Sequence, residues 1–271
     1  MKMWTITLAP LALGGLLACG GHGSTSTTPP SSRLDGETAV TLAAAFLNEE
    51  NNQAGENDGS GPMAAGQAEG LALPASPSCV AVSGATASSI TWTFNNCTGP
   101  HGWTWNGVVV ISWVKNPDGS WLVKHDQQHM VGTKDGRSWT INGVKDLLKD
   151  PATKTVRLAA EPGFTKAFND GSKTTTYTYT CNLTADWSTP DQRKLSGSWG
   201  LAPRGGGGDA VSAVIAAATP LVWDRSANCC YPVSGTLVLT RGGQTATIVH
   251  ALPCGSLTVN GEARSLPACS R

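Results

Sequence analysis

The sequence predicts an all-β protein made of antiparallel strands joined as meanders and hairpins. Charged residues make up only 14% of the chain and glycine is abundant, a composition typical of strands and turns. From Cys79 onward, apolar and polar residues alternate with a period of two. Turn signals such as Asn116-Pro117-Asp118-Gly119 and Gly242-Gly243 separate the alternating runs. Short turns argue against a parallel sheet with crossover helices, so we expect either a sandwich or one long twisted sheet.

The N-terminal part of the chain lacks this alternation and divides into three segments. Residues 1–18 place a lysine before an apolar run that is too short to span a membrane, a pattern typical of a signal peptide. Residues 19–36 are rich in Gly, Ser, Thr and Pro and predict a flexible tether. Residues 37–78 contain the one expected helix, from Glu37 to Glu50, whose apolar residues recur at helical spacing. A low-complexity linker completes this third segment.

The end of the leader carries the most specific motif of the chain. Leu16-Leu17-Ala18-Cys19 resembles the lipobox of bacterial lipoproteins. The resemblance implies cleavage before Cys19 and attachment of acyl chains such as palmitate to that cysteine, so that membrane lipid is its partner. It also implies a location in the cell envelope, and Gly20 in place of Asp resembles cargo sent to the outer membrane. The motif therefore predicts where the protein is located and says nothing about its activity.

The β-rich body is expected over residues 79–271. Its clearest strand is Thr175 to Trp187, where apolar side chains alternate with Thr, Asn and Asp as they do in a sheet with one face on a core. Seven further runs fit the same template: Ser89–Phe94, Trp103–Trp113, Trp121–Val131, Ser138–Val144, Leu195–Leu201, Val233–Thr240 and Gln244–His250.

Internal similarity suggests that this body has two related halves, residues 79–146 and 173–271. Each half contains the pattern Cys-x-x-Val-Ser-Gly, starting at Cys79 and at Cys230, followed by a strand pair, a cysteine and an Asn-Gly dipeptide. The phrase Trp-Thr-x-Asn-Gly-Val also occurs twice, in residues 103–108 and 139–144. The repeat predicts either two similar sheets or one long sheet made by duplication.

The cysteines predict a covalent framework for the two halves, because an extracytoplasmic chain can oxidise them. If Gly242-Gly243 is the tip of a hairpin, Cys230 lies nearly opposite Cys254, and the same reasoning places Cys79 opposite Cys97. We therefore expect disulfides between Cys79 and Cys97 and between Cys230 and Cys254, each worth about 3 kcal/mol. The pairing of the three remaining cysteines, Cys181, Cys229 and Cys269, stays open. A bond between Cys181 and Cys269 is one choice.

The charge balance and the motifs of the sequence limit the classes of function that the protein can have. The 19 basic and 19 acidic side chains balance, so the chain lacks the basic footprint of a nucleic-acid-binding protein. No Gly-x-Ser-x-Gly elbow occurs, and no pattern points to a cofactor. We therefore expect a membrane-anchored, non-enzymatic binding or structural module whose partner is a protein or a glycan.

Two histidines are weak candidates for a metal site. His125 and His129 have the i, i+4 spacing of a zincin helix, with Asp126 in the place of the usual Glu. The flanking apolar residues fit a strand at least as well, and there the histidines would lie on a solvated polar face. A metal-dependent hydrolase is thus the third hypothesis, and we expect no bound metal.

Tryptophans offer the alternative of a carbohydrate-binding module. Nine follow the leader, and on neighbouring strands Trp103, Trp105, Trp121 and Trp139 would form an aromatic row able to stack on sugar rings. The competing interpretation is that these rings fill a core that is short of Phe and Leu. We favour the core.

Overall fold

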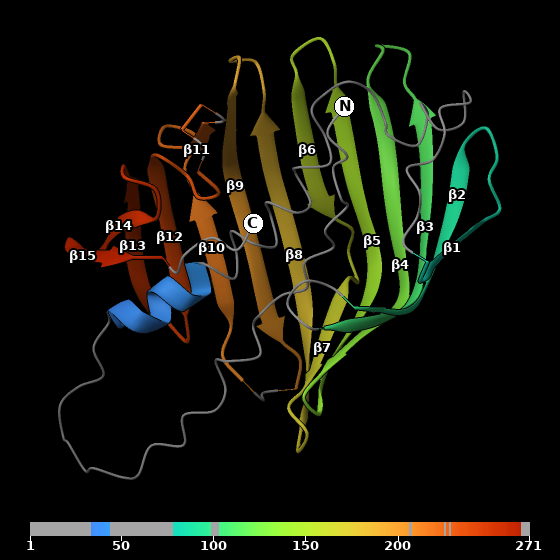
Figure 1. Cartoon of the computed structure of the whole chain (residues 1–271), viewed down its shortest axis with the longest axis horizontal. Helices are drawn as coiled ribbons and strands as arrows, with labels where there is room; N and C mark the ends of the chain where they lie inside the picture. The colour runs from blue at the N-terminus through green and yellow to red at the C-terminus, as the bar shows by residue number, and fades with distance from the viewer. Residues whose placement is uncertain are drawn as a thin grey trace.

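The computed structural model describes residues 34–43, 78–98, 103–205, 208–224, 226–227 and 229–266. Most of these residues belong to one antiparallel sheet of 15 strands (Figure 1). The strands are β1 (Val80–Ser83), β2 (Ser89–Thr98), β3 (Thr104–Lys115), β4 (Trp121–Lys134), β5 (Arg137–Asp150), β6 (Thr155–Ala160), β7 (Thr165–Asn169), β8 (Thr174–Asp186), β9 (Gln192–Pro203), β10 (Val211–Ile215), β11 (Leu221–Asp224), β12 (Gly235–Arg241), β13 (Gln244–Ala251), β14 (Ser256–Val259) and β15 (Glu262–Ser265). The all-β prediction is confirmed, in the form of one long sheet.

The chain builds this sheet by adding each strand beside the preceding one. The order is β1-β2-β3-β4-β5-β6-β8-β9-β10-β12-β13-β14-β15, with β7 between β5 and β8 and with β11 beside β9. Tight turns set the register, as in β12 and β13, where Arg241 faces Gln244 across Gly242-Gly243 as expected. Each of the eight runs proposed from the alternation corresponds to a strand, with differences of at most two residues where a run extends beyond its strand: β2, β3, β4, β5, β8, β9, β12 and β13.

Two strands of the sheet are each broken into two labelled pieces. β6 and β7 both lie between β5 and β8, and residues 161–164 interrupt them. Pro162 and Gly163, the latter with a φ of 95°, account for this break, because proline has no N–H for the ladder and glycine tolerates the turn. β10 and β11 likewise both lie beside β9, and residues 216–220 separate them.

Four glycines bend the sheet, and three of them, Gly143, Gly197 and Gly235, lie beside these breaks. Gly107, Gly143, Gly197 and Gly235 have φ angles between 117° and 141°, a region that side chains rarely adopt. A Cβ on Gly197 would lie 2.1 Å from the carbonyl oxygen of Asn182, and one on Gly235 would lie 2.2 Å from that of Pro220. Bulges and close backbone approach of this kind curve a sheet, which gives it a hollowed face.

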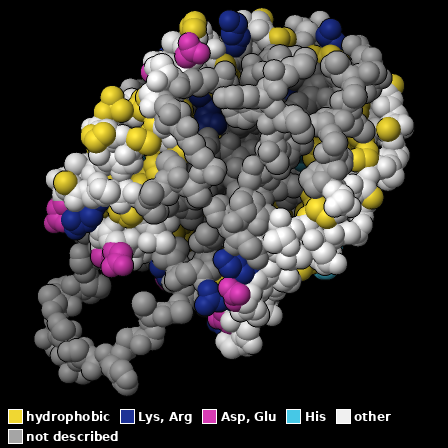
Figure 2. All heavy atoms as spheres, in the orientation of Figure 1, with side chains coloured by type: hydrophobic (Ala, Val, Ile, Leu, Met, Phe, Trp, Pro, Cys, Tyr) yellow, Lys and Arg dark blue, Asp and Glu magenta, His cyan; other side chains and the backbone are white. Residues whose placement is uncertain are grey.

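The hydrophobic core lies on one face of the sheet, which we call the inner face. In β8, Tyr179, Cys181 and Leu183 are buried on it, whereas the intervening Thr180 and Asn182 are exposed on the opposite, outer face. Residues that face each other on neighbouring strands lie on the same face of the sheet. Trp199, which faces Cys181, and Leu158, which faces Leu183, are therefore also on the inner face. Figure 2 shows hydrophobic, basic and acidic side chains of the described residues on both sides of the molecule in the orientation of Figure 1.

A short helix, residues 36–43, lies in front of one end of the sheet in Figure 1. The Asp35 carboxylate accepts the N–H of Thr38 at 2.9 Å, and hydrogen bonds from Thr38 lower the pKa of this N-cap. The N–H of Leu34 donates to the carbonyl of Thr245 in β13 at 2.9 Å, which fixes the helix at this end of the sheet. The expected helix, 37–50, is thus confirmed for residues 37–43, and residues 44–50 lie outside the described part. Four residues of this segment are buried in the core: Leu34, Ala39, Leu42 and Ala43.

Disulfides link residues near the two ends of the sheet. Cys79 and Cys97 are bonded as expected, beside the β1–β2 hairpin. The second bond joins Cys229 to Cys254, so the expected bond between Cys230 and Cys254 is wrong. The hairpin register stops at Gly235, because the preceding residues leave β13 and pair instead with β11, where the N–H of Val233 donates to Val222. Extrapolating the register past Gly235 therefore chose the wrong neighbour.

The remaining cysteines also differ from expectation. Cys230 is itself disulfide-bonded, and its carbonyl accepts a hydrogen bond from the Trp223 indole at 3.2 Å. Cys181 is a buried thiol that donates to the carbonyl of Leu158 at 3.9 Å, so a bond from Cys181 to Cys269 is wrong. Cys19 and Cys269 lie outside the described residues. In the part that the structure describes, no helix is long and apolar enough to cross a membrane.

Candidate functional site

The break between β6 and β7 brings two lysines and two aromatic rings together on the inner face. Phe164, the last residue of the break, packs on Gly143 of β5, where a Cβ would lie 2.6 Å from its ring. Its carbonyl accepts the N–H of Tyr179 at 2.9 Å, which holds β8 against the break. The rings of Phe164 and Tyr179 then lie 4.8 Å apart, centroid to centroid.

Lys145 and Lys166 place their ammonium groups against Tyr179. The Nζ of Lys166 lies 4.2 Å from the centroid of the Tyr179 ring, and the Nζ of Lys145 lies 5.0 Å from it. Lys145 Nζ is also 5.6 Å from the Phe164 ring. Both lysines are almost fully buried, with 3% and 1% of their surface exposed. The aromatic faces attract these cations and fix their positions.

Lys149 and His125 extend this group toward β4. Lys149 is buried on the inner face of β5, four residues along the strand from Lys145, and faces Trp121. His125 faces Lys145 across the β4–β5 pair. Burial, followed by the charges of Lys149 and Lys145, lowers the pKa of His125 to about 4. At neutral pH His125 is therefore uncharged.

Arg193 adds a fourth buried cation further along the sheet. Its guanidinium carbon lies 4.0 Å from the centroid of the Trp223 ring, which faces it across the β9–β11 pair, and 5.8 Å from the Trp187 ring. Only 3% of its surface is exposed. We call Lys145, Lys149, Lys166 and Arg193 the cationic cluster.

The carboxylates of the same strands lie on the outer face. Asp146 alternates with Lys145, and on the outer face the ammonium of Lys124 lies 3.3 Å from Asp146 and also pairs with Glu161. Asp126 and Asp186 likewise occupy the outer phase of β4 and β8. In β4, β5 and β8 the carboxylates of Asp126, Asp146 and Asp186 therefore lie on the outer face, together with the lysine Lys124, whereas Lys145, Lys149, Lys166 and Arg193 lie on the inner face.

The two candidate metal ligands are not arranged for zinc. They lie on β4 and not on a helix, with a bulge between Gln127 and Met130. His129 is exposed with a φ of 51°, and its N–H donates to Asn142 Oδ1 at 2.7 Å, whereas His125 is on the inner face. Within the described ranges, no group of three or more His, Cys, Asp or Glu residues could hold a metal ion. The zincin-helix interpretation is therefore wrong, as is the shared polar face.

The four candidate tryptophans belong mostly to the core. Trp103, Trp105 and Trp139 are buried, with at most 9% of their surface exposed, so the core interpretation is confirmed and an exposed platform of these rings is wrong. Trp105 lies over Gly132 of β4, and Trp139 stacks on Phe168 at 4.7 Å. Trp121 is half-buried, with Lys115 Nζ 5.5 Å from its ring.

Sequence reasoning missed the cationic cluster, although one signal was present. Lys145 and Lys149 continue the apolar phase of the Ser138–Val144 run, on the same side as Leu147. A lysine in the apolar phase of a strand indicates a buried cation. Lys166 and Arg193 have no comparable signal, because β7 is short and Arg193 precedes the alternating run of β9.

Comparison with known proteins gives no relative. No family model, no curated protein and no solved structure matches this chain. The functional argument therefore depends on the site itself.

Proposed function

We propose that the protein is a lipid-anchored, non-enzymatic binding module of the cell envelope. The lipobox-like Leu16-Leu17-Ala18-Cys19 supports the anchor and, with Gly20, a location at the outer membrane. The bonds Cys79–Cys97 and Cys229–Cys254 support an oxidising compartment outside the cytoplasm. Lipid on Cys19 would leave the sheet free to bind a partner at the membrane surface.

We further propose that the module binds an anionic ligand on its inner face. The observation that carries this proposal is the cationic cluster, four basic side chains buried among aromatic and aliphatic residues. Buried cations prefer carboxylate or phosphate as partners, and the surrounding apolar side chains favour a ligand with an apolar body. The ligand class is therefore an amphiphile with a carboxylate or phosphate group.

Fractionation tests the anchor. Replacing Cys19 by Ser removes the lipidation site, so we expect the variant to leave the membrane fraction and to lose label from radioactive palmitate. The wild-type chain should require detergent for extraction. Recovery of the wild type in the soluble fraction without detergent would overturn the assignment.

Binding measurements test the ligand class. We expect laurate and dodecyl phosphate to raise the Tm of the full chain in a neutral detergent, and Lys166→Met to weaken their binding at least tenfold. Lys124→Met is the matched control, because it removes a lysine of the outer face and should leave binding unchanged. A Tm shift with glycans alone, lost in Trp121→Ala, would favour the carbohydrate-binding alternative. No shift with any of these probes would contradict ligand binding on the inner face.

A further inference from the structure

We propose that Cys230 forms a third disulfide with Cys269 and that this bond holds the edge strand β15 on the sheet. Cys230 is disulfide-bonded, and Cys269 lies three residues beyond Leu266, where the described part of the chain ends. One step of the inference, the assignment of Cys19, rests on the proposed lipid anchor. The other steps depend on the positions of described residues.

The cysteine content leaves two candidates for the partner of Cys230 within this sequence. Of the eight cysteines, four form the two bonds already described, and Cys181 is a thiol. Cys19 and Cys269 remain. In the proposed anchor the sulfur of Cys19 carries lipid, which leaves Cys269 as the partner.

The described residues bring the two sides of this bond to one place. The N–H of the buried Leu266 donates to the carbonyl of Gly255 at 2.9 Å. A Cβ on Gly255 would lie 3.6 Å from Tyr231 Cδ2 and 3.8 Å from the carbonyl oxygen of Leu266. Tyr231 is the neighbour of Cys230, and three extended residues after Leu266 reach about 10 Å. Since a disulfide needs Cα atoms about 5.5 Å apart, Cys269 is within reach of Cys230.

The bond forms by thiol–disulfide exchange. The thiols of Cys230 and Cys269 each lose one proton and one electron, and their sulfur atoms join. The two electrons and two protons convert the disulfide of a thiol–disulfide oxidoreductase into two thiols. The neighbouring bond Cys229–Cys254 requires the same kind of oxidant, so the third bond needs no additional reactant.

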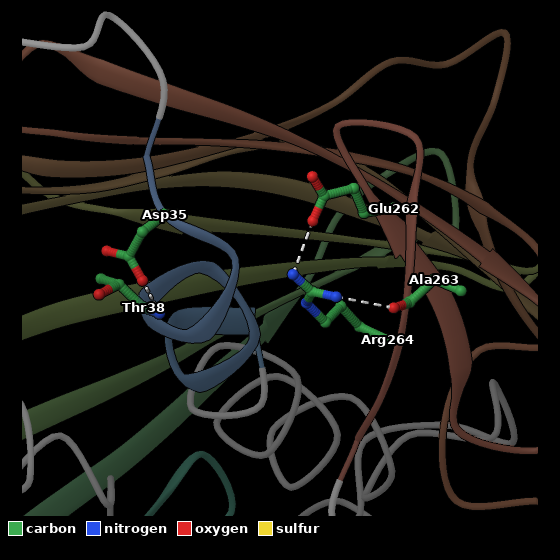
Figure 3. A network of polar contacts seen from close by, with 5 residues as sticks. All are labelled: Asp35, Thr38, Glu262, Ala263 and Arg264. Atoms are coloured by element: carbon green, nitrogen blue, oxygen red, sulfur yellow. Dashed lines mark hydrogen bonds and ion pairs between the residues drawn. The ribbon is translucent and has the colours of Figure 1, made fainter.

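The strand that this bond holds, β15, has few other contacts. It pairs with β14 through four residue pairs, and all four of its side chains are exposed. Its Arg264 bonds within the strand to the Glu262 carboxylate and to the carbonyl of Ala263 (Figure 3). Arg264 also touches the helix at Gly36, where a Cβ would lie 3.0 Å from its Nε. A strand with so few contacts opens locally at little cost.

A bond from Cys230 to Cys269 opposes this opening. Cys230 lies between β11 and β12, and Cys269 follows β15, so the bond closes a ring of the chain that contains β12 to β15. β15 is then fixed at both ends, by the turn from β14 and by the disulfide. Loss of this edge strand would expose the unpaired backbone of β14 to other chains.

Non-reducing peptide mapping of the full chain, extracted in a neutral detergent, tests the pairing. Trypsin should release one cluster in which peptides 226–241, 242–264 and 265–271 are joined, because the first of them contains two adjacent cysteines. Stepwise reduction, with alkylation after each step, should then assign Cys230 to Cys269. Recovery of Cys269 as a thiol, or joined only between differently isotope-labelled molecules, would overturn the inference.

Radioactive palmitate separates this inference from the proposed anchor. A bond between Cys230 and Cys19, in a chain without label, would overturn both. Label on Cys19 together with a thiol at Cys269 would overturn the third disulfide alone. The bond between Cys230 and Cys269 in an unlabelled chain would support the inference and would count against the anchor only.

Amide hydrogen exchange tests the role of the bond. The double variant Cys230→Ser, Cys269→Ser removes the bond and leaves no new thiol, so we expect peptides that cover β15 to exchange at least tenfold faster. β1, the opposite edge strand of equal length, is the internal control, and its exchange should not change. Cys181→Ser is the matched variant, because it removes a cysteine and keeps all three bonds. Equal exchange of β15 in the double variant and the wild type would contradict the role, and the mapping of the wild type tests the pairing even if the variant does not fold.

Discussion

Burial of His250 makes the stability of the protein depend on pH. It lies on the inner face between Gly235 and Leu257, with 3% of its surface exposed, and neither ring nitrogen has a hydrogen-bond partner among the described residues. Burial lowers the pKa of His250 to about 4, below the ordinary value of 6.5. The unfolded chain therefore binds the proton first as the pH falls.

We expect acid to destabilise the protein between pH 6.5 and pH 4 through this residue. Above pH 6.5, the ordinary pKa of histidine, His250 should not reduce the free energy of unfolding. As the pH falls toward 4, that free energy should decrease by on the order of 3 kcal/mol. Urea titrations at several pH values in wild type and His250→Leu measure the effect. The variant should show a shallower pH dependence, and an identical slope in both proteins would contradict the assignment.

Gly197 shows how a single position shapes the sheet. Its φ of 120° and its approach to the carbonyl of Asn182 exclude a side chain, so we expect Gly197→Ala to lower the free energy of unfolding by about 3 kcal/mol. Gly119→Ala is the control, because Gly119 has a φ of 88° but nothing within 4 Å of its Cβ position, and it should cost about 1 kcal/mol. Equal losses in urea unfolding would show that the close approach is unimportant.

At the scale of single residues, pairings between neighbours in the chain could be predicted from the sequence, whereas contacts between distant strands could not. The Cys79–Cys97 bond was predictable because it is adjacent to a hairpin and its register is local. The roles of Lys166 and Phe164 were not, because they depend on the break at residues 161–164 that brings β5, β7 and β8 together. Contacts across several strands have no periodic signature in one chain.

Among the elements, the repeated phrase Trp-Thr-x-Asn-Gly-Val corresponds to a repeated bulge. In the first copy, Asn106 Oδ1 accepts the N–H of Asn96, and in the second, Asn142 Oδ1 accepts the N–H of His129, at 2.9 and 2.7 Å. Both donor residues have positive φ, 53° and 51°. The similarity of the two phrases thus has a local structural cause.

Long strands were predictable from alternation, and short ones were not. β8 has 13 residues and a clear period of two, whereas β11, β14 and β15 have four residues each. Four residues contain too few alternations to distinguish a strand from a loop. The broken strands β6–β7 and β10–β11 were missed for the same reason, since each piece has four to six residues.

The Cys229–Cys254 bond makes a prediction at this scale. It closes a loop with a sequence separation of 25 residues between β11 and β14, so its removal should cost about 3 kcal/mol. Non-reducing peptide mapping should recover Cys229 joined to Cys254, and Cys229→Ser should lower the urea midpoint. Cys181→Ser, which changes a buried thiol, is the control and should leave the mapped bonds intact. Recovery of Cys230 joined to Cys254 would contradict the structure.

For the whole molecule, the two expected halves are parts of one sheet. β8 and β9, which begin the second half, continue the ladder of the first through ten residue pairs with each other and through β6 and β7. One core cluster runs from Ile90 to Leu266. The repeat therefore does not divide the described part of the sheet into separate packing units.

We expect this continuity to give a single unfolding transition. Far-UV circular dichroism and tryptophan fluorescence should report the same urea midpoint, because loss of either half exposes the core of the other. Reduction of the disulfides should lower the midpoint and keep the two signals coincident. Two separated transitions would show instead that residues 79–146 and 173–271 fold independently.

The two ends of the sheet determine whether molecules remain apart. An edge strand offers unpaired backbone groups to any other chain, and a neutral protein has little long-range repulsion to prevent contact. β1 and β15 are only four residues long, and in β15 all four side chains are exposed and Arg264 pairs with Glu262 at 2.7 Å. Short edges of this kind, with charged side chains in β15, terminate hydrogen bonding in the lateral direction. They keep a long sheet from growing into a fibre.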